Sequence, residues 1–470
     1  MARKNKTQEI IENVEIVDIA DDGRAVGKVG DLVVFVSRAV PGDVVDVRVT
    51  RKRRRYVETV PVRFGKFSQW RVKPFCNTFA LCGGCKWQDL DYSRQLFFKH
   101  KNVKDCFSRI GKLDFPAIAP VLAAQQTTYY RNKLEFTFSS NRWLTEEDMN
   151  LEEGAVNRNA LGFHIPGRFD KVLDIDHCHL QPDPSNAIRN AIREFALKEN
   201  IPFYDLRNHQ GYLRTLIIRV SPATKKVMVI ITLNYEDIAL REKTLDFVWK
   251  RFPEITSLMY VINPKLNDSI SDLEVVLYKG VPYIEEEMEG MKFKLGPKSF
   301  FQTNSIQAYE LYKIIRNFAG LTGSEIVYDL YTGVGTIANF LAKNAKKVIG
   351  VECVSEAIEN ANYNSIINGI RNTFFFVGDM KDVFTIEFVQ QHGTPDVVVL
   401  DPPRAGLHAK VIEALLLVMP KKVIYVSCNP SSQARDLALM HDNYKITAVQ
   451  PVDIFPHTHH VENVTALERR

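Results

Sequence analysis

Residues 326–336 read Ile-Val-Tyr-Asp-Leu-Tyr-Thr-Gly-Val-Gly-Thr, a short apolar stretch that runs directly into a glycine-rich turn. A strand followed by glycines, which let the backbone approach a ligand, and then by a helix is typical of a nucleotide-binding sheet. The pattern from Gly333 to Ala338 also satisfies a loose dinucleotide fingerprint. At this point a nicotinamide or flavin enzyme therefore remains an alternative.

The same rhythm extends from about residue 291 to the C-terminus. Short apolar stretches alternate with longer stretches that we expect to be helical. The expected strands are Ile326–Leu330, Lys347–Val351, Asn372–Val377, Asp396–Leu400 and Val423–Val426, and the expected helices include Ser355–Ile367 and Ala409–Leu417. This alternation predicts an α/β fold with a doubly wound, mainly parallel, Rossmann-like sheet, which binds its ligand at the carboxyl ends of its strands.

Acidic residues stand at the ends of successive expected strands. Glu352 ends the second strand, where a carboxylate can accept hydrogen bonds from both ribose hydroxyls. Asp379 ends the third strand, near the expected adenine amino group, and Asp401 ends the fourth. The turn lacks a phosphate-binding Lys-Ser/Thr pair, which favours a nucleoside ligand without phosphates. The stretch resembles the class I methyltransferases, whose ligand is S-adenosylmethionine.

A candidate nucleophile and a candidate base lie beyond these strands. Cys428 follows the fifth expected strand, and Glu462 lies next to the last one. Carbon 5 of uracil is a weak nucleophile, but a thiolate added to carbon 6 turns the ring into an enolate that can attack a methyl donor. A base then removes the proton from carbon 5, and the cysteine leaves. One cysteine, one base and one methyl donor suffice for this reaction.

Four segments make the resemblance specific, namely Ser299–Asn304, Asp401–Gly406, Ser427–Pro430 and His460–Val464. They resemble the signature segments of the RNA (uracil-5-)-methyltransferase family, and the resemblance covers essentially the whole chain. It implies that Cys428 is the nucleophile and Glu462 the base. It also implies that S-adenosylmethionine is bound by Gln302, Tyr331, Glu352 and Asp401, with Asp379 near an additional contact.

The chain has seven cysteines, and this odd number argues against a disulfide framework. Three of them, Cys76, Cys82 and Cys85, lie within ten residues, and Cys178 is the best candidate for a fourth ligand. Four thiolates can hold zinc or an iron–sulfur cluster, and the neighbouring histidines His177 and His179 keep zinc open. The family resemblance implies a [4Fe–4S] cluster of the ribosomal RNA branch, with a structural and RNA-organising role.

Other side chains that could carry chemistry receive simpler interpretations. We expect Cys106 and Cys353 to be core residues, because a lone cysteine in an apolar stretch is usually buried. His457, His459 and His460 could indicate a metal, but they lack an obvious set of partner ligands. We interpret them as loop residues that position Glu462 or contact RNA.

Several features point to RNA as the partner. Short strands and turns over residues 12–64 predict a small β-barrel, and the basic run Arg51–Arg55 is expected on its last hairpin. Such a run can bind phosphates or simply be a solvated loop. Residues 7–65 resemble the TRAM domain, an RNA-binding barrel. Tyr129–Lys133 matches a family segment that could grip RNA, and Phe300 and Phe301 could stack on an extruded base.

We therefore expect three parts: a TRAM-like, OB-like barrel (1–66), a central α/β cluster domain (67–290) and a Rossmann-like class I methyltransferase domain (291–470). The central part should contain a helix at Tyr92–Ile110 and strands at Leu134–Ser139, Leu213–Val220 and Val227–Leu233. Hydrophobic residues make up 45% and charged residues 25%, with a net charge of +5, as in soluble proteins. We expect no membrane span and no signal peptide behind the charged residues Met1–Lys6.

These expectations combine into one function: C5-methylation of a uridine in 23S ribosomal RNA by a cytoplasmic monomer without an obligate protein partner. The barrel and the cysteines favour ribosomal RNA by family analogy, and methylation of transfer RNA is the alternative. Two other classes compete. A methyltransferase acting on another atom, such as an adenine nitrogen, would not need Cys428. A non-catalytic RNA-binding protein would not need the set of Cys428, Glu462 and Asp401.

Overall fold

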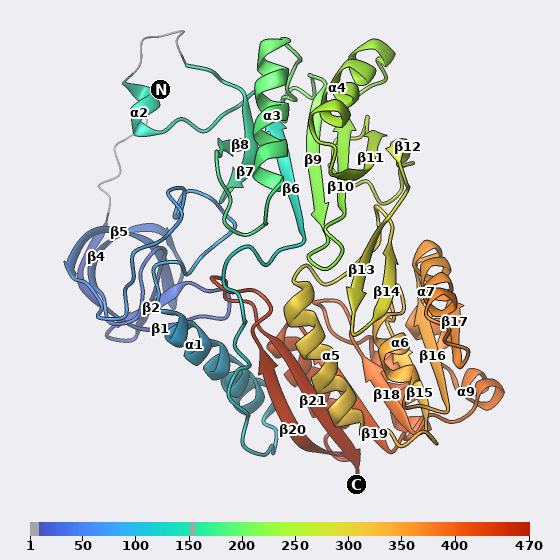
Figure 1. Ribbon diagram of the computed structural model, residues 1–470. Helices are drawn as coiled ribbons and strands as arrows, with labels where there is room; N and C mark the ends of the chain where they lie inside the picture. The colour runs from blue at the N-terminus through green and yellow to red at the C-terminus, as the bar shows by residue number, and fades with distance from the viewer. Residues whose placement is uncertain (1–8, 151–155) are drawn as a thin grey trace.

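The computed structural model describes residues 9–150 and 156–470 (Figure 1). The segment Met1–Lys6, in which no signal peptide is expected, lies outside the described residues. A closed barrel comes first, followed by a mixed sheet and then by a second, mainly parallel sheet. Within the described part of the chain, no helix is both long enough and apolar enough to cross a bilayer.

The N-terminal barrel closes in the order β1-β2-β3-β5-β4. Its strands are β1 (Ile10–Ile19), β2 (Ala25–Val29), β3 (Leu32–Val36), β4 (Val44–Lys52) and β5 (Tyr56–Lys66). Alternate apolar residues such as Val34 and Val36, or Val45 and Val47, point inward and form the barrel core. The expected barrel is confirmed, and Arg51–Arg55 are exposed on the β4–β5 hairpin.

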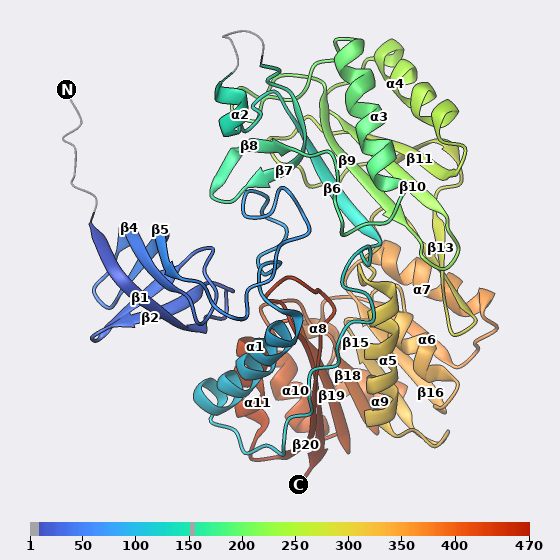
Figure 2. The ribbon, with the colours of Figure 1, turned by 60° about the vertical axis from the view of Figure 1, so that its left-hand side comes forward.

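A helix connects the barrel to the rest of the molecule. The expected helix is present as α1 (Tyr92–Asp105), which continues into one π-helical turn, Cys106–Gly111. Asp91 caps its N-terminus by accepting a hydrogen bond from the backbone of Ser93. Cys106 is buried, as expected, and its thiol lies 3.3 Å from the hydroxyl of Ser431 at the C-terminal domain. Helix α1 thus lies against the C-terminal domain, beside the barrel (Figure 2).

The central sheet has the strand order β12-β11-β10-β9-β6-β7-β8. The strands are β6 (Lys133–Ser139), β7 (Ala160–Ile165), β8 (Arg168–Asp174), β9 (Leu213–Val220), β10 (Val227–Leu233), β11 (Ile255–Ile262) and β12 (Val276–Gly280). The accompanying helices are α2 (Glu146–Met149), α3 (Ser185–Lys198) and α4 (Ile238–Arg251). A separate hairpin, β13 (Ile284–Met288) and β14 (Met291–Leu295), leads into the last domain.

The C-terminal sheet has the order β17-β16-β15-β18-β19-β21-β20. Its strands are β15 (Ile326–Leu330), β16 (Lys347–Glu352), β17 (Thr373–Val377), β18 (Val397–Leu400), β19 (Lys422–Ser427), β20 (Tyr444–Val452) and β21 (Glu462–Arg469). The first five of these pair in parallel, and β21 and β20 add antiparallel strands. The expected doubly wound sheet is confirmed.

Helices cover both faces of this sheet (Figure 1). They are α5 (Ser305–Ala319), α6 (Thr336–Ala342), α7 (Ser355–Ile367), α8 (Met380–Val383), α9 (Ile386–His392), α10 (Ala409–Val418) and α11 (Pro430–Met440). Neighbouring strand residues belong to different cores: Val327 packs on the α5 side, whereas Tyr328 packs with residues of α10 and α11. Burial on both faces explains why the strands read as continuous apolar runs.

Candidate active site

The carboxyl ends of the parallel strands bring the acidic candidates to one edge of the sheet. Leu330 at the end of β15 pairs with Val351 on one side and with Leu400 on the other. The residues that follow these three, Tyr331, Glu352 and Asp401, therefore share the edge at which such sheets bind ligands.

The turn after β15 forms a cradle at this edge. Gly333 has a φ of +56°, and a Cβ added there would meet only open space. Its backbone N–H donates to Glu352 Oε2 at 3.2 Å. Asp329 is fully buried and accepts a hydrogen bond from Thr332 Oγ1, while its Oδ1 has no hydrogen-bond partner within the described part of the chain. An open glycine backbone and a buried acceptor fit a nucleoside cofactor.

Gln302 lies on a segment that the central domain holds in place. Asn132 Nδ2 donates to the backbone oxygen of Gln302 at 2.9 Å and to Ser305 Oγ at 2.8 Å. The neighbouring phenylalanines differ from the expectation that either could stack on a base. Phe300 is 69% exposed, but Phe301 packs in the core and is therefore wrong as a stacking residue.

Asp379 and Cys353 lie at the outer part of the same edge. The Asp379 carboxylate caps helix α8 and forms an ion pair with Lys381 at 2.8 Å. Asp379 is exposed, and its contact with the cofactor stays a prediction. Cys353 is exposed and donates to Glu352 Oε1 at 3.1 Å. The expectation that Cys353 is a core residue is wrong, because it comes just after the buried part of β16.

Strand pairing brings the candidate nucleophile and the candidate base together. The antiparallel strands β19 and β21 pair Ser427 with Asn463, so the next position in the register places Cys428 beside Glu462. Glu462 is buried and Cys428 is partly buried. The charges of Asp401 and Arg404 affect the pKa of both side chains, and Arg404 lines the same cavity as Cys428.

Burial sets the proton affinity of this group. It raises the pKa of Glu462 to about 8, with a further rise from Asp401 and an opposing effect from Arg404. Burial, together with Glu462 and Asp401, raises the pKa of Cys428 to about 11, again opposed by Arg404. Asp401 itself has its pKa raised by burial to about 7. Arg404 thus favours the thiolate and the carboxylate that the expected chemistry requires.

The cavity at Cys428 also includes residues that nothing in the sequence marked as part of the site. It has a volume of about 150 Å³ and is lined by Asp21, Asp22, Asn102, Arg404, Cys428, Asn429, Pro430, Ser431, His459, His460 and Val461. Asp21 and Asp22 come from the barrel and Asn102 from α1. Arg404 lies in the Asp401–Gly406 segment that the sequence had already marked, whereas nothing in the sequence marked Asp21, Asp22 or Asn102 as part of this cavity.

Known proteins resemble the chain in the same segments. A family model for tRNA (uracil-5-)-methyltransferases matches residues 281–470, and a TRAM domain model matches residues 6–62. An RNA methyltransferase of Bacteroides thetaiotaomicron is 54% identical over 96% of this chain and 100% of the relative. One from Chlorobaculum tepidum is 38% identical over 98% of this chain and 96% of the relative. The chain belongs to the RNA (uracil-5-)-methyltransferase family.

A solved structure resembles this RNA methyltransferase over its whole length. The crystal structure of Pyrococcus abyssi tRNA (uracil-54, C5)-methyltransferase in complex with S-adenosyl-L-homocysteine gives a TM-score of 0.75 at 28% identity. It covers 97% of this chain and 100% of the other. The N-terminal barrel is thus a TRAM domain, and the C-terminal sheet has the Rossmann-like methyltransferase fold.

The four candidate metal ligands of this methyltransferase line one cavity. Cys76, Cys82, Cys85 and Cys178 face a space of about 390 Å³ between the segment after the barrel and the central sheet. Burial raises the pKa of Cys82 to about 11 and that of Cys85 to about 12. A bound metal group stabilises thiolates and would offset this rise in pKa, so four thiols around one cavity fit such a group. Within residues 9–150 and 156–470, no group of three or more possible ligands has the geometry to hold a single metal ion.

Aromatic side chains flank the cysteine cavity. Tyr129 is 41% exposed, and its hydroxyl lies 3.0 Å from His177 Nε2 and 3.1 Å from His179 Nδ1. Tyr130 is buried, and its hydroxyl donates to the backbone oxygen of Pro456. Of the Tyr129–Lys133 segment, Tyr129 therefore presents an aromatic ring to solvent, while Tyr130 anchors the segment.

Proposed function

We propose that this protein methylates carbon 5 of a uridine in 23S ribosomal RNA with S-adenosylmethionine as the methyl donor. The observation that carries the proposal is the position of Cys428 and Glu462, which directly adjoin the Ser427–Asn463 pair at the ligand edge of the sheet and interact electrostatically. Transfer RNA is the second candidate, because the Pyrococcus abyssi enzyme of similar structure acts on tRNA by its name. The four cysteines favour ribosomal RNA by analogy with the ribosomal RNA branch of the family, whereas the barrel does not distinguish the two substrates, since the Pyrococcus abyssi structure matches 97% of this chain.

The cofactor would be held by Gln302, Tyr331, Glu352 and Asp401, with Asp379 at the margin. Bound S-adenosylmethionine supplies the methyl group that carbon 5 receives. The burial of Asp329 and the open backbone at Gly333 support a ligand in this cradle.

The protein's own groups would perform three tasks. The Cys428 sulfur forms a bond to carbon 6 of the uracil and makes carbon 5 nucleophilic. After methyl transfer, Glu462 removes the proton from carbon 5, and the bond between carbon 6 and sulfur breaks. Arg404 supports both groups, since its positive charge lowers the proton affinity of the thiol and of the carboxyl group.

RNA binding would use exposed groups on separate parts of the chain. Arg51–Arg55 on the barrel hairpin can neutralise phosphates. Phe300, two residues before Gln302, is exposed enough to stack on an extruded base.

We further propose three domains with boundaries at 1–66, 67–290 and 291–470. We propose that the reaction takes place in the cytoplasm and is carried out by a monomer without an obligate protein partner.

We further propose that Cys76, Cys82, Cys85 and Cys178 hold a [4Fe–4S] cluster with a structural role. Their shared cavity supports this proposal, and no step of the methyl transfer requires an electron.

Replacing Cys178 with serine tests the cluster. Protein purified without oxygen should contain about four iron atoms per chain, and Cys178→Ser should lose most of them together with thermal stability. Cys106→Ser is the matched control, because Cys106 is also buried but does not line the cysteine cavity, and its thiol faces Ser431 instead. This variant should retain its iron. Zinc in place of iron, or unchanged iron in Cys178→Ser, would contradict the cluster.

A trapping experiment tests the substrate. Protein and S-adenosylmethionine are mixed with 5-fluorouridine-containing fragments of 23S rRNA and, in parallel, with 5-fluorouridine-containing tRNA. Because fluorine cannot leave as a cation, the enzyme should remain joined to carbon 6, and a denaturing gel should show a shifted band. We expect the band with rRNA. A band with tRNA alone moves the substrate to tRNA, and no band with either RNA rejects the cysteine addition.

A further inference from the structure

The segment 453–461 connects β20 to β21 and leads directly into Glu462, the first residue of β21. His459, His460 and Val461 form one wall of the cavity at Cys428. Any shift of this segment would move that wall and the start of β21. The position of the candidate base therefore depends on what holds the segment.

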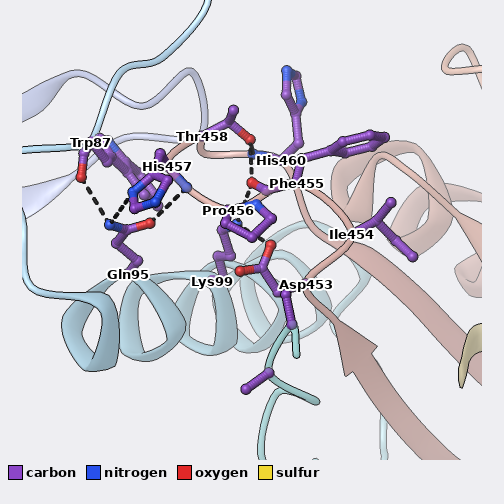
Figure 3. Close-up of polar contacts among 12 residues, drawn as sticks. Trp87, Gln95, Lys99, Asp453, Ile454, Phe455, Pro456, His457, Thr458 and His460 are labelled. Atoms are coloured by element: carbon purple, nitrogen blue, oxygen red, sulfur yellow. Dashed lines mark hydrogen bonds and ion pairs between the residues drawn. The ribbon is translucent and has the colours of Figure 1, made fainter. Parts of the chain in front are cut away.

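Helix α1 holds the segment from one side (Figure 3). Lys99 Nζ lies 2.6 Å from Asp453 Oδ1, and both side chains are completely buried. The same ammonium group donates to the backbone oxygen of Phe455 at 3.0 Å. Gln95 Oε1 accepts from the backbone N–H of His457 at 2.9 Å. These contacts fix the first half of the segment, Asp453 to His457.

The TRAM barrel holds the segment from the other side through a short bridge. The backbone N–H groups of Lys86 and Trp87 both donate to the His457 oxygen, at 2.9 and 3.1 Å. In turn, Trp87 Nε1 donates to the oxygen of Gly23 at 3.0 Å, and Lys86 Nζ donates to the oxygen of Asp22 at 2.8 Å. The turn between β1 and β2 is thus linked to His457 through the hydrogen bonds of Lys86 and Trp87.

Gly23 also contacts the segment directly. It has a φ of +84°, and a Cβ added there would lie 2.8 Å from the Cβ of His459. His459 cannot avoid this contact by turning its ring, because its Cβ is fixed to the backbone. The absence of a side chain at Gly23 therefore lets the barrel turn pack against His459, while Asp21 and Asp22 of the same turn line the cavity at Cys428.

We propose that the β1–β2 turn of the TRAM barrel positions the catalytic wall, with Gly23 as the positioning residue that seats His459 and thereby Glu462. The proposal rests on the proposed function, since it gives the barrel a part in the methylation step. The barrel then has two separate tasks: its β4–β5 hairpin binds RNA, and its β1–β2 turn completes the active site.

Gly23→Ala tests the proposal, with Gly30→Ala as the matched control. Gly30 lies in the next turn of the same barrel and also has a positive φ, +57°, but an added Cβ there meets nothing within 4 Å. For Gly23→Ala we expect a roughly 10- to 100-fold lower kcat, with the KM values for RNA and for S-adenosylmethionine almost unchanged. Gly30→Ala should keep the wild-type kcat. Replacing Arg51 and Arg53 with glutamine should instead raise the KM for RNA.

Hydrogen exchange gives a readout that does not depend on activity. Gly23→Ala should speed exchange in residues 453–461 in the intact protein, whereas Gly30→Ala should not. Trp87→Phe removes the donor to Gly23 and keeps an aromatic ring in the core, and it should show the same change. It serves as the test if Gly23→Ala fails to fold.

Two results would overturn the positioning role. One is wild-type exchange of residues 453–461 in both Gly23→Ala and Trp87→Phe; the other is a kcat for Gly23→Ala equal to that of Gly30→Ala. If the wild-type protein methylates no RNA, the proposed function fails, and the exchange comparison still decides whether the turn holds the segment.

Discussion

Replacing Cys428 with alanine is expected to abolish methylation while leaving the fold intact. The thiol supplies the bond to carbon 6 without which carbon 5 cannot attack a methyl group, and no other cysteine lines this cavity in the described part of the chain. We expect kcat to fall by at least ~10⁴-fold, which corresponds to an increase of about 5.4 kcal/mol in the activation free energy. Incorporation of labelled methyl groups into RNA measures the loss.

The controls separate loss of chemistry from loss of structure. Cys428→Ala should bind S-adenosylmethionine as the wild type does and should form no covalent band with 5-fluorouridine RNA. Cys106→Ala removes a buried thiol that contacts Ser431 but does not itself line the cavity at Cys428; it should lower stability by about 1 kcal/mol while retaining methylation. Full methylation by Cys428→Ala would show that the target is another atom, as in a methyltransferase that acts on an adenine nitrogen.

The sequence predicted the sheet and therefore the strand ends at which the candidate site residues stand. Cys428 and Glu462 each adjoin a strand, and the ligand edge of a doubly wound sheet follows from its topology. The pairing of β19 with β21 then brings the two positions together, because both adjoin the Ser427–Asn463 pair. Local pattern was sufficient here because the relevant residues lie at strand ends.

The remaining parts depend on how distant segments dock. Asp21 and Asp22 line the cavity at Cys428 although some 400 residues separate them in the chain, and no local pattern in a barrel turn reports such a contact. The same holds for Phe300 and Phe301, which look alike in sequence but differ because one ring faces solvent and the other packs in the core. The expectation for Cys353 was wrong because burial along β16 ends at Val351, two residues earlier.

Replacing Glu462 with glutamine is expected to stop turnover after the covalent bond has formed. Glutamine keeps the shape of the side chain but cannot take the proton from carbon 5, so the methylated RNA should remain joined to Cys428. We expect at least a ~10³-fold lower kcat and a covalent band even with RNA that contains no fluorine. Glu468→Gln, an exposed position on the same strand, is the matched control and should turn over normally.

The pH dependence gives an independent check on Glu462. Burial raises its pKa to about 8, so the free enzyme holds this carboxyl group mostly protonated at pH 7, and kcat/KM should rise as the pH increases toward 8. A raised pKa in the folded state means that stability is lost as the pH rises from about 4.5 through 8, because the unfolded chain ionises more readily. Glu462→Gln should therefore melt at a higher temperature than the wild type at pH 9, with a smaller difference at pH 5, whereas Glu468→Gln should show no such gain. Equal melting temperatures at pH 9 would mean that Glu462 is not the buried acid that the proposed proton removal requires.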